Sequence, residues 1–439
     1  MKTEQNPKFC VADKNKEFLS VYITTFGCSA NQADSEIMAG LLAKAGYELV
    51  NGAEEAGLVI VNSCIVKGKT ETHVFREIAR LKKLKKKIIV AGCMPQTKVF
   101  ANKLRDVSVL GVFETHRIAE AVKATLAGRK ISWLSTKKTE KLCFPRLRKN
   151  PVIAVVVISS GCVGHCTYCL VKLAKGELFS YPEKSIIHEI KTALKEGCRE
   201  IWLTSQDCTV YGLDINSNFV NLLKKILDLV GDFFIRIGMS NPDNILKNLD
   251  GLIKLYKNPK VFKFLHMPVQ SGNDDILKAM NRKYTVSDFK KIITKFRKEI
   301  PEVTISTDLI CGFPTETDRQ FADSLNLIRW LKPDVLNLNL FWPRPETVAA
   351  KMPQLMPGIG RKRTRIVTKE FEKIALDKNK SWIGWKGSAL VDENGKSGGL
   401  VARNFAYKPI VIQGKAKLGS FVKLKITDST KNYLIGKIL

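Results

Sequence analysis

Two long stretches of the chain alternate short apolar segments with amphipathic ones, and this alternation constrains the fold more than any other feature. Segments such as 57–64 (GLVIVNSC) and 151–160 (PVIAVVVISS) have the length and the Val/Ile content of buried strands. The segment 32–50 instead spaces its apolar residues as a helix does. Strand and helix patterns in alternation predict parallel sheets covered by helices, so we expect an α/β protein.

The first 130 residues predict a small parallel sheet of the Rossmann-like type. The region that follows is basic and irregular and contains a proline, which is typical of a linker. We therefore place an N-terminal domain at 1–130 and a basic linker at 131–150. The strands expected in the first domain are 20–28, 57–64, 87–93 and 107–112.

A second series of strand patterns begins at residue 151. Each of its first five strands is followed by a helix pattern, and six βα units are fewer than the eight of a closed TIM barrel. We therefore expect a partial (β/α)6 barrel at 151–378. Its expected strands are 151–160, 199–205, 233–240, 262–269, 303–312 and 334–341.

The last 60 or so residues change character after a basic helix near 361–379. Short strand patterns broken by glycine-rich turns predict a small antiparallel β-barrel at 379–439.

The formal charge of +30 arises from 72 Lys and Arg against 42 Asp and Glu, an excess typical of proteins that bind a phosphate backbone. Nucleic acid is the expected partner; the alternative is that runs such as 81–87 (LKKLKKK) are solvated helix faces. The sequence shows neither a run of ~18 apolar residues nor a signal-like N-terminus, so we expect a cytoplasmic protein with no membrane contact.

Eleven cysteines without an export signal should stay reduced, which makes metal ligation the question to ask. Six of them fall into two groups of three. The other five share no spacing and are expected to be buried small hydrophobes or bystanders. These are Cys10, Cys143, Cys198, Cys208 and Cys311.

The first group, Cys162, Cys166 and Cys169, has C-x3-C-x2-C spacing in one loop after a strand. Three thiolates leave one iron of a [4Fe–4S] cluster open, where S-adenosylmethionine (SAM) can chelate and be cleaved to a 5′-deoxyadenosyl radical. The alternative is a structural zinc site. A structural zinc site normally has four protein ligands. His165 is the candidate fourth ligand, but it lies between two of the cysteines, where it cannot easily fold back onto the same metal.

The second group, Cys28, Cys64 and Cys93, has long spacings, but each cysteine closes a predicted strand. The carboxyl ends of parallel strands meet at one edge of a sheet, so the three sulfurs can converge there on a second cluster. The alternative is chance burial of three cysteines. A dinucleotide site is not favoured, because no G-x-G-x-x-G follows the first strand.

With both groups in place, the chain resembles the methylthiotransferases, and most closely the archaeal and eukaryotic branch that acts on N6-threonylcarbamoyladenosine in tRNA. The resemblance spans nearly the whole chain, including an auxiliary-cluster domain, a radical SAM barrel and a TRAM module. The motifs that carry it are TTFGCSANQADSE, VNSC, AGCMPQ, GCVGHCTYCLVKLAKGELFSYP, HMPVQSGNDDILKAMNRKYT, STDLICGFPTET and RNFAYKPIVI.

This resemblance implies methylthiolation at C2 of N6-threonylcarbamoyladenosine at position 37 of tRNA. It implies two [4Fe–4S] clusters, SAM as both radical precursor and methyl donor, the anticodon stem-loop of ANN-decoding tRNA as partner, and an electron donor such as ferredoxin or flavodoxin. Alternatives within the family are a ribosomal-protein aspartate or isopentenyladenosine in tRNA as substrate. An alternative of another class is a non-catalytic RNA-binding protein with structural metal.

Analogy to radical SAM enzymes also implies contacts to SAM at the ends of the barrel strands. Tyr168 would pack near the adenine, although a core aromatic is the alternative. The other expected contacts are Ser205, Gln206 and Asp207 for the methionine amine, Ser240 and Asn241 for the ribose, and Gly312 and Phe313 for the adenine.

Lys175 stands where related sequences tend to carry arginine, so a bidentate grip there is not expected. In the TRAM module, Arg403, Lys408 and the aromatic Phe405 and Tyr407 are expected to contact RNA, with plain packing as the alternative for Tyr407. Animal members of the family carry a C-terminal membrane anchor, which this chain does not show.

Overall fold

The computed structural model describes residues 19–66, 68–395 and 398–439, and within them the chain forms two compact units. The first unit comprises the described residues up to Thr139 together with Phe144–Leu147. The second comprises Glu140–Cys143 and Arg148–Leu439, and therefore contains both barrels. Of the helices in these described ranges, none combines the length and the apolar character needed to cross a bilayer.

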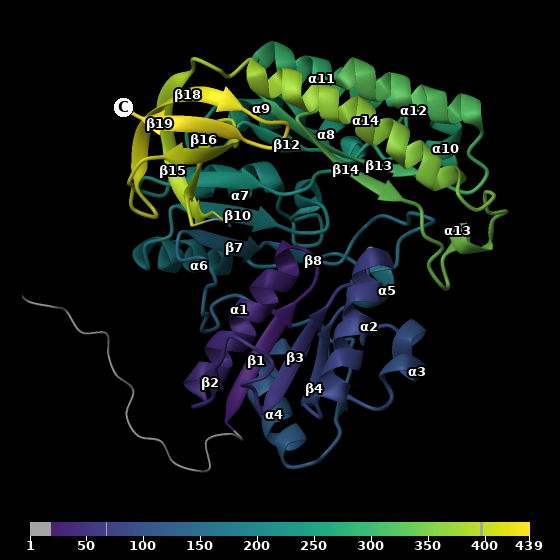
Figure 1. The fold of residues 1–439 in the computed structure, drawn as a ribbon, viewed down its shortest axis with the longest axis vertical. Helices are drawn as coiled ribbons and strands as arrows, with labels where there is room; N and C mark the ends of the chain where they lie inside the picture. Colours follow the sequence, from purple (N-terminus) through teal and green to yellow (C-terminus); the bar gives the residue numbers. More distant parts are fainter. Residues whose placement is uncertain (1–18, 67, 396–397) are drawn as a thin grey trace, which may run out of the picture. The chain divides into compact units, whose positions relative to one another are not determined.

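The first unit is built on a parallel sheet of six strands in the order β2-β1-β3-β4-β5-β6 (Figure 1). The four predicted strands are confirmed. Two further strands are only two residues long, too short to leave a pattern, and one of them, β6, lies inside the predicted linker. The strands are β1 (Ser20–Thr25), β2 (Glu48–Leu49), β3 (Leu58–Ser63), β4 (Lys87–Gly92), β5 (Ser108–Gly111) and β6 (Ser132–Trp133).

Helices α1 (Ser29–Lys44) and α4 (Ile118–Leu126) share one core with alternate residues of β1, β3 and β4. Helix α2 (Gly68–Lys83) buries Val74, Ile78 and Leu81 and exposes its lysines to solvent. Of the lysine-rich run that begins at Leu81, Lys82 and Lys83 are exposed on α2, whereas Lys86 and Lys87 are partly buried and donate to backbone carbonyl oxygens. The short helices of this unit are η2 (Lys98–Phe100), α3 (Ala101–Leu104) and η3 (Thr115–Arg117).

The second unit opens with the predicted partial barrel, whose six strands pair in parallel. Its two halves, β7-β10-β11 and β12-β13-β14, meet at a parallel bridge between Ile235 and Val261. The six strands are β7 (Ile153–Val157), β10 (Glu200–Thr204), β11 (Phe234–Ile237), β12 (Phe264–His266), β13 (Thr304–Cys311) and β14 (Val335–Leu340). A small antiparallel pair, β8 (Ser159–Ser160) and β9 (Phe179–Ser180), flanks the cysteine loop.

Helices follow the strands along the chain, and α11, α12 and α14 lie together beside β13 and β14 (Figure 1). Capping boxes begin α11 at Thr285 and α12 at Thr317. The helices of the partial barrel are α5 (Val171–Lys175), α6 (Glu183–Lys195), η4 (Cys208–Val210), α7 (Phe219–Leu227), α8 (Pro242–Leu246), α9 (Leu249–Tyr256), α10 (Asp274–Ala279), α11 (Val286–Glu299), α12 (Asp318–Leu331), α13 (Val348–Lys351) and α14 (Ile359–Lys380).

The C-terminal strands close into a five-stranded barrel in the order β15-β16-β17-β19-β18. The barrel is antiparallel except where β17 and β19 pair in parallel, which the sequence pattern did not indicate. Its strands are β15 (Lys386–Asn394), β16 (Leu400–Asn404), β17 (Pro409–Gln413), β18 (Phe421–Ser429) and β19 (Leu434–Ile438).

Two of the four expected RNA contacts of this small barrel instead join it to the larger one: the packing alternative holds for Tyr407, and the expectation of a free RNA-binding cation is wrong for Lys408. Tyr407 is buried against Phe262 and Phe264 of the partial barrel. Lys408 is also buried, and its ammonium lies 2.7 Å from Asp334. Arg403 is largely covered and pairs with Asp392.

Candidate active site

The loop that carries Cys162, Cys166 and Cys169 follows β7 and β8, and its cysteines lie near one another. A Cβ on Gly164 would lie 3.4 Å from the Cys162 sulfur and 3.9 Å from the Cys166 sulfur, so this glycine sits between the two thiols. The Cys169 amide donates to the Cys166 carbonyl oxygen at 3.1 Å.

Gly161 fixes where this loop begins. Its φ is +83°, and a Cβ there would lie 1.8 Å from the carbonyl oxygen of Glu177, so no larger residue fits without moving the backbone. The Cys162 amide donates to the Gly176 carbonyl oxygen at 3.1 Å. The first cysteine is thus held against the turn that ends α5, whose last residue, Lys175, is buried.

Cys162 and Cys169 lie in surroundings that disfavour a negative charge on their sulfurs unless a cation is present. Burial raises the pKa of Cys162, and burial followed by the charge of Cys166 raises the pKa of Cys169 to about 12. Three such thiolates fit an iron–sulfur cluster, whose irons balance their charge. His165, the candidate fourth zinc ligand, is exposed and its Nε2 lies 2.8 Å from the Lys172 ammonium.

Within the described part of the chain, no three Cys, His, Asp or Glu side chains are already arranged around a metal position. Cluster ligation by either group of cysteines therefore stays a prediction that rests on the donor set and on the surrounding residues.

Arg282 joins the cysteine loop to the strand ends of the barrel, and sequence reasoning missed it. Its Nη1 donates to the Cys166 sulfur at 3.1 Å, its Nη2 to Asn241 Oδ1, and its Nε to the Tyr284 hydroxyl at 3.1 Å. The only sequence signal was its place in the motif HMPVQSGNDDILKAMNRKYT. One side chain thereby positions a cysteine and a predicted ribose contact.

Asp207, predicted to meet the methionine amine, is already engaged by the protein. Its buried carboxylate accepts hydrogen bonds from Asn241 Nδ2 at 2.8 Å, Asn244 Nδ2 at 2.9 Å and the Thr209 amide at 3.0 Å. Burial raises its pKa, and these donors oppose the rise. Ser205 in turn accepts from the Asp207 amide at 3.1 Å. Asp207 therefore orients Asn241 and the end of β10.

Two other predicted SAM contacts carry polar atoms that lack a hydrogen-bond partner in the described part of the chain. Gln206 Oε1 and Ser240 Oγ are buried, and neither has a hydrogen-bond partner among the described residues. Since buried polar groups are nearly always paired in a finished site, these atoms suit a polar ligand such as SAM. They lie just past the carboxyl ends of β10 and β11, the edge at which barrel enzymes bind substrates.

The predicted adenine contacts belong in part to a hydrophobic core. The Tyr168 ring meets the Phe313 ring edge-on, with centroids 6.4 Å apart. Phe313 is fully buried beside Met280 and Ile310, so its ring is covered by protein. Gly312 has a φ of +76°, and its amide donates to Glu316. Tyr168 and Phe313 therefore pack against each other in this core, and contact of Tyr168, Gly312 and Phe313 with an adenine stays a prediction.

In the first unit, the structure brings the second group of cysteines to neighbouring strand ends. Cys28, Cys64 and Cys93 follow β1, β3 and β4, which are adjacent in the sheet. A Cβ on Gly27 would lie 2.5 Å from the Cys64 Cβ, and the Cys93 amide donates to the Ser63 carbonyl oxygen at 3.0 Å. Cys28 is exposed, whereas Cys64 and Cys93 are buried.

Two asparagines that sequence reasoning missed connect these strand ends. Asn31 Nδ2 donates to Asn62 Oδ1 at 3.2 Å and to the Ser63 carbonyl oxygen at 3.0 Å. Asn31 Oδ1 accepts from the Cys28 thiol at 3.3 Å. Both asparagines are buried, and both lie in motifs already noted, CSANQADSE and VNSC. They hold two of the three cysteine-bearing segments in register.

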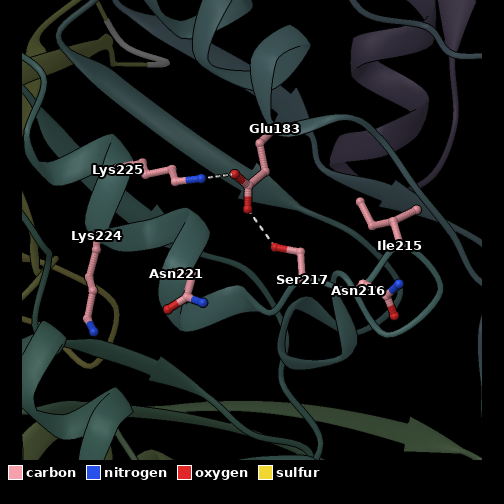
Figure 2. Close-up of a pocket in the computed structure, with 7 residues that line it drawn as sticks. All are labelled: Glu183, Ile215, Asn216, Ser217, Asn221, Lys224 and Lys225. Atoms are coloured by element: carbon pink, nitrogen blue, oxygen red, sulfur yellow. Dashed lines mark hydrogen bonds and ion pairs between the residues drawn. The ribbon is translucent and has the colours of Figure 1, made fainter.

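A separate pocket in the second unit, shown in Figure 2, contains none of the predicted site residues. Glu183 is one of its lining residues; Ser217 donates to the Glu183 carboxylate at 2.5 Å and Lys225 pairs with it. Those two partners lower the pKa of Glu183 and leave its charge neutralised. The carboxylate is therefore occupied by its own neighbours.

Three family models match the chain in the order that the fold suggests. They are Uncharacterized protein family UPF0004 over residues 20–110, the Radical SAM superfamily over 156–328, and the TRAM domain over 387–439.

Curated relatives match almost the whole chain. A probable threonylcarbamoyladenosine tRNA methylthiotransferase of Pyrococcus horikoshii is 40% identical, over 96% of this chain and all of the relative. The chain belongs to the threonylcarbamoyladenosine tRNA methylthiotransferase family. The human member of this family is 38% identical over 95% of this chain and 73% of its own length. The resemblance predicted from the motifs is confirmed, and the chain is a radical SAM transferase.

Among solved structures, the radical SAM methyltransferase TsrM of Kitasatospora setae, with cobalamin and a [4Fe–4S] cluster bound, has a similar fold. Its TM-score is 0.55 at 12% identity, over 75% of this chain and 74% of that one. At such low identity the likeness concerns the fold alone, and it supports the partial barrel of the methylthiotransferase family.

Proposed function

We propose that the protein attaches a methylthio group to C2 of N6-threonylcarbamoyladenosine at position 37 of tRNA. The observation that carries this proposal is the 40% identity, across all three modules, to a relative named for that substrate. The excess of 30 positive charges agrees with an RNA substrate.

For the radical step, Cys162, Cys166 and Cys169 would hold a [4Fe–4S] cluster with one open iron for SAM. When bound, the cluster supplies the electron that cleaves SAM to the 5′-deoxyadenosyl radical. Arg282 holds Cys166 and Asn241 together through its two Nη donors. Gln206 and Ser240 would give the bound SAM the hydrogen bonds that their buried oxygens now lack.

For sulfur delivery, Cys28, Cys64 and Cys93 would hold a second [4Fe–4S] cluster. The network of Asn31 and Asn62 keeps the strand ends in place whether or not the cluster is present, because it uses only protein atoms. An open iron of that cluster would give the transferred sulfur a place to bind. The electrons would come from a small donor such as ferredoxin or flavodoxin, and the RNA partner would be the anticodon stem-loop of ANN-decoding tRNA.

The deciding experiment is turnover by the anaerobically reconstituted protein on tRNA with and without the threonylcarbamoyl group, followed by mass analysis of the nucleosides. Methylthiolated product only from the modified tRNA supports the proposal. Equal product from both tRNAs, or product only from isopentenyladenosine-bearing tRNA, would reject the assigned substrate.

Substitution of the two cysteine groups separates the two proposed roles. Replacing Cys162, Cys166 and Cys169 with Ala should remove about four of eight irons and abolish 5′-deoxyadenosine formation. Replacing Cys28, Cys64 and Cys93 should also remove about four irons and stop methylthiolation, yet leave SAM cleavage in place.

The matched control for these variants is Cys143→Ser, because Cys143 is an exposed cysteine outside both groups. It should keep all the iron and both activities. Loss of SAM cleavage in both triple variants would contradict separate roles for the two groups.

A further inference from the structure

Three positive side chains line one surface pocket at the start of α14. Arg361, Lys362 and Arg365 surround a pocket of about 420 Å³ together with Gly358 and Ile366. All three are exposed, and none forms an ion pair with another described residue. The charge of Lys362 acts on the nearby exposed carboxylate of Asp318, and no such partner is found for Arg361 or Arg365 among the described residues. An exposed cluster with this excess of positive charge suits a polyanion.

The neighbouring Arg363 shows that this cluster is not simply a basic helix. Arg363 is buried, and its guanidinium pairs with Glu316 at 2.7 Å and Asp318 at 2.8 Å. The first turns of α14 therefore carry two kinds of cationic side chain. Arg363 is buried and neutralised by carboxylates, whereas the other three are exposed to solvent.

The pocket lies beside the edge of the barrel at which the predicted site residues gather. Gly360 packs on Gly312, since a Cβ on Gly312 would lie 2.8 Å from the Gly360 Cα. Leu340, the last residue of β14, also reaches Gly360. From Gly312 the contacts continue through Phe313 to Tyr168 in the cysteine loop. Arg361, the first cation of the cluster, therefore follows directly on Gly360, and Gly360 is connected through these contacts to the cysteine loop.

Two large apolar side chains near this edge are open to solvent. Trp342, two residues past β14, is 54% exposed, and Met356, two residues before Gly358, is 70% exposed. Trp342 follows Leu340, which contacts Gly360 at the start of the cationic cluster, by two residues. Exposed aromatic rings together with cations suit single-stranded nucleic acid, because every base can stack on an aromatic ring. Binding of a free phosphate ion would not require an exposed aromatic side chain.

We propose that Arg361, Lys362 and Arg365 bind phosphates of the RNA strand that carries the target adenosine, and that Trp342 stacks on an unpaired base of the same strand. This inference rests on the proposed function, because it takes a tRNA loop as the partner. It assigns RNA binding to the rim of the partial barrel, where none of the three family models or the expected contacts placed it.

The test compares two triple variants of the full-length, reconstituted protein that change the net charge equally. The first is Arg361→Glu, Lys362→Glu and Arg365→Glu. The control is Lys254→Glu, Lys291→Glu and Lys298→Glu, which changes exposed lysines on the outer helices α9 and α11. Binding of threonylcarbamoylated tRNA is measured over a range of salt concentrations, together with iron content and RNA-independent SAM cleavage.

The first variant should bind tRNA at least tenfold more weakly and lower the slope of log affinity against log salt by about 2, since each lost phosphate contact removes about 0.7. Its iron content and RNA-independent SAM cleavage should match the wild type, and the control should bind within about twofold of it. Equal weakening in both variants, or none in the first, would overturn the α14 site. A wild-type protein that binds no tRNA would reject the proposed function as well.

The role of Trp342 has its own pair of variants. Trp342→Ala should raise the KM for tRNA about tenfold and leave the salt slope unchanged, because stacking is worth about 1–3 kcal/mol and carries no charge. The control is Trp330→Ala, since Trp330 is similarly exposed, at 41%, but lies on α12 beneath Lys290. An unchanged KM in the first variant, or an equal rise in both, would exclude base stacking on Trp342.

Discussion

At the scale of single residues, the chemistry-bearing cysteines could be predicted from the sequence and the residues that position them could not. The spacing of Cys162, Cys166 and Cys169 is local, so it is visible in the printed sequence. Arg282 contacts Cys166 across 116 positions of the chain, and Asn31 contacts Asn62 across 31. Neither contact leaves a pattern in the sequence, because only the fold brings those side chains together.

Arg282 gives a prediction at this scale. Arg282→Met should lower the kcat of SAM cleavage about 10- to 100-fold, the usual cost of removing a partner of a metal ligand, because Cys166 and Asn241 lose their shared donor. Arg282→Lys keeps the charge without the planar fork, so it should recover only part of the rate. The measurements are iron content, kcat and the KM for SAM. A loss of iron in exact proportion to activity would indicate a purely structural role.

At the scale of elements, the strands long enough to show a pattern were predicted, and the departures have local causes. Strands β2 and β6 have two residues each, and the parallel pairing of β17 with β19 depends on how the barrel closes. The conformation of a loop is harder to predict from sequence than the position of a strand, because it can depend on the φ angle of a single residue. The cysteine loop is the clearest instance, since it begins at Gly161 with a positive φ.

Gly161→Ala should therefore disrupt this loop more than a positive φ alone explains. Alanine at a left-handed position costs about 1–2 kcal/mol, and here its Cβ would also collide with the Glu177 carbonyl oxygen. We expect a lower melting temperature and loss of about four irons. The control is Gly197→Ala, where φ is also positive, at +98°, but a Cβ would meet nothing within 4 Å. Equal melting temperatures for the two variants would contradict the collision.

At the scale of the whole molecule, the unexpected result is that the partial barrel and the C-terminal barrel form one compact unit. Lys408 looked like a surface cation in the sequence, yet it shares the buried Asp334 with Lys378. A lysine that faces solvent and one that enters a buried ion pair have the same local sequence signal. The family models also identify the two modules separately, so neither source indicated how firmly they are joined.

Asp334 makes this joint sensitive to acid. Burial raises its pKa, but the charges of Lys408 and Lys378 outweigh that effect and leave the pKa below its ordinary value. The unfolded carboxyl, with a pKa of about 3.9, then binds a proton more readily than the folded one, so the stability it contributes is present at neutral pH and lost as the pH falls below about 4.

Asp334→Asn should lower the free energy of unfolding of the second unit by about 3–5 kcal/mol at pH 7, because it leaves two lysines without their partner. The difference from the wild type should shrink at pH 3.5. Asp250→Asn is the control, since Asp250 forms an exposed pair with Lys295 and should cost less than about 1 kcal/mol. Urea unfolding at both pH values measures these differences, and a gap that does not change with pH would contradict the charge-based account.

The contact between Gly312 and Gly360 joins the proposed RNA-binding cluster to the edge of the barrel where the proposed SAM contacts lie. Since neither residue has a side chain, the start of α14 touches the end of β13 directly. If the cations that follow Gly360 grip the RNA backbone, the number of nucleotides from grip to target is a constant of the fold. The close contact of the two glycines would then determine which nucleotide of the loop reaches the active site. A larger residue at either position would change which base is modified before it weakened RNA binding.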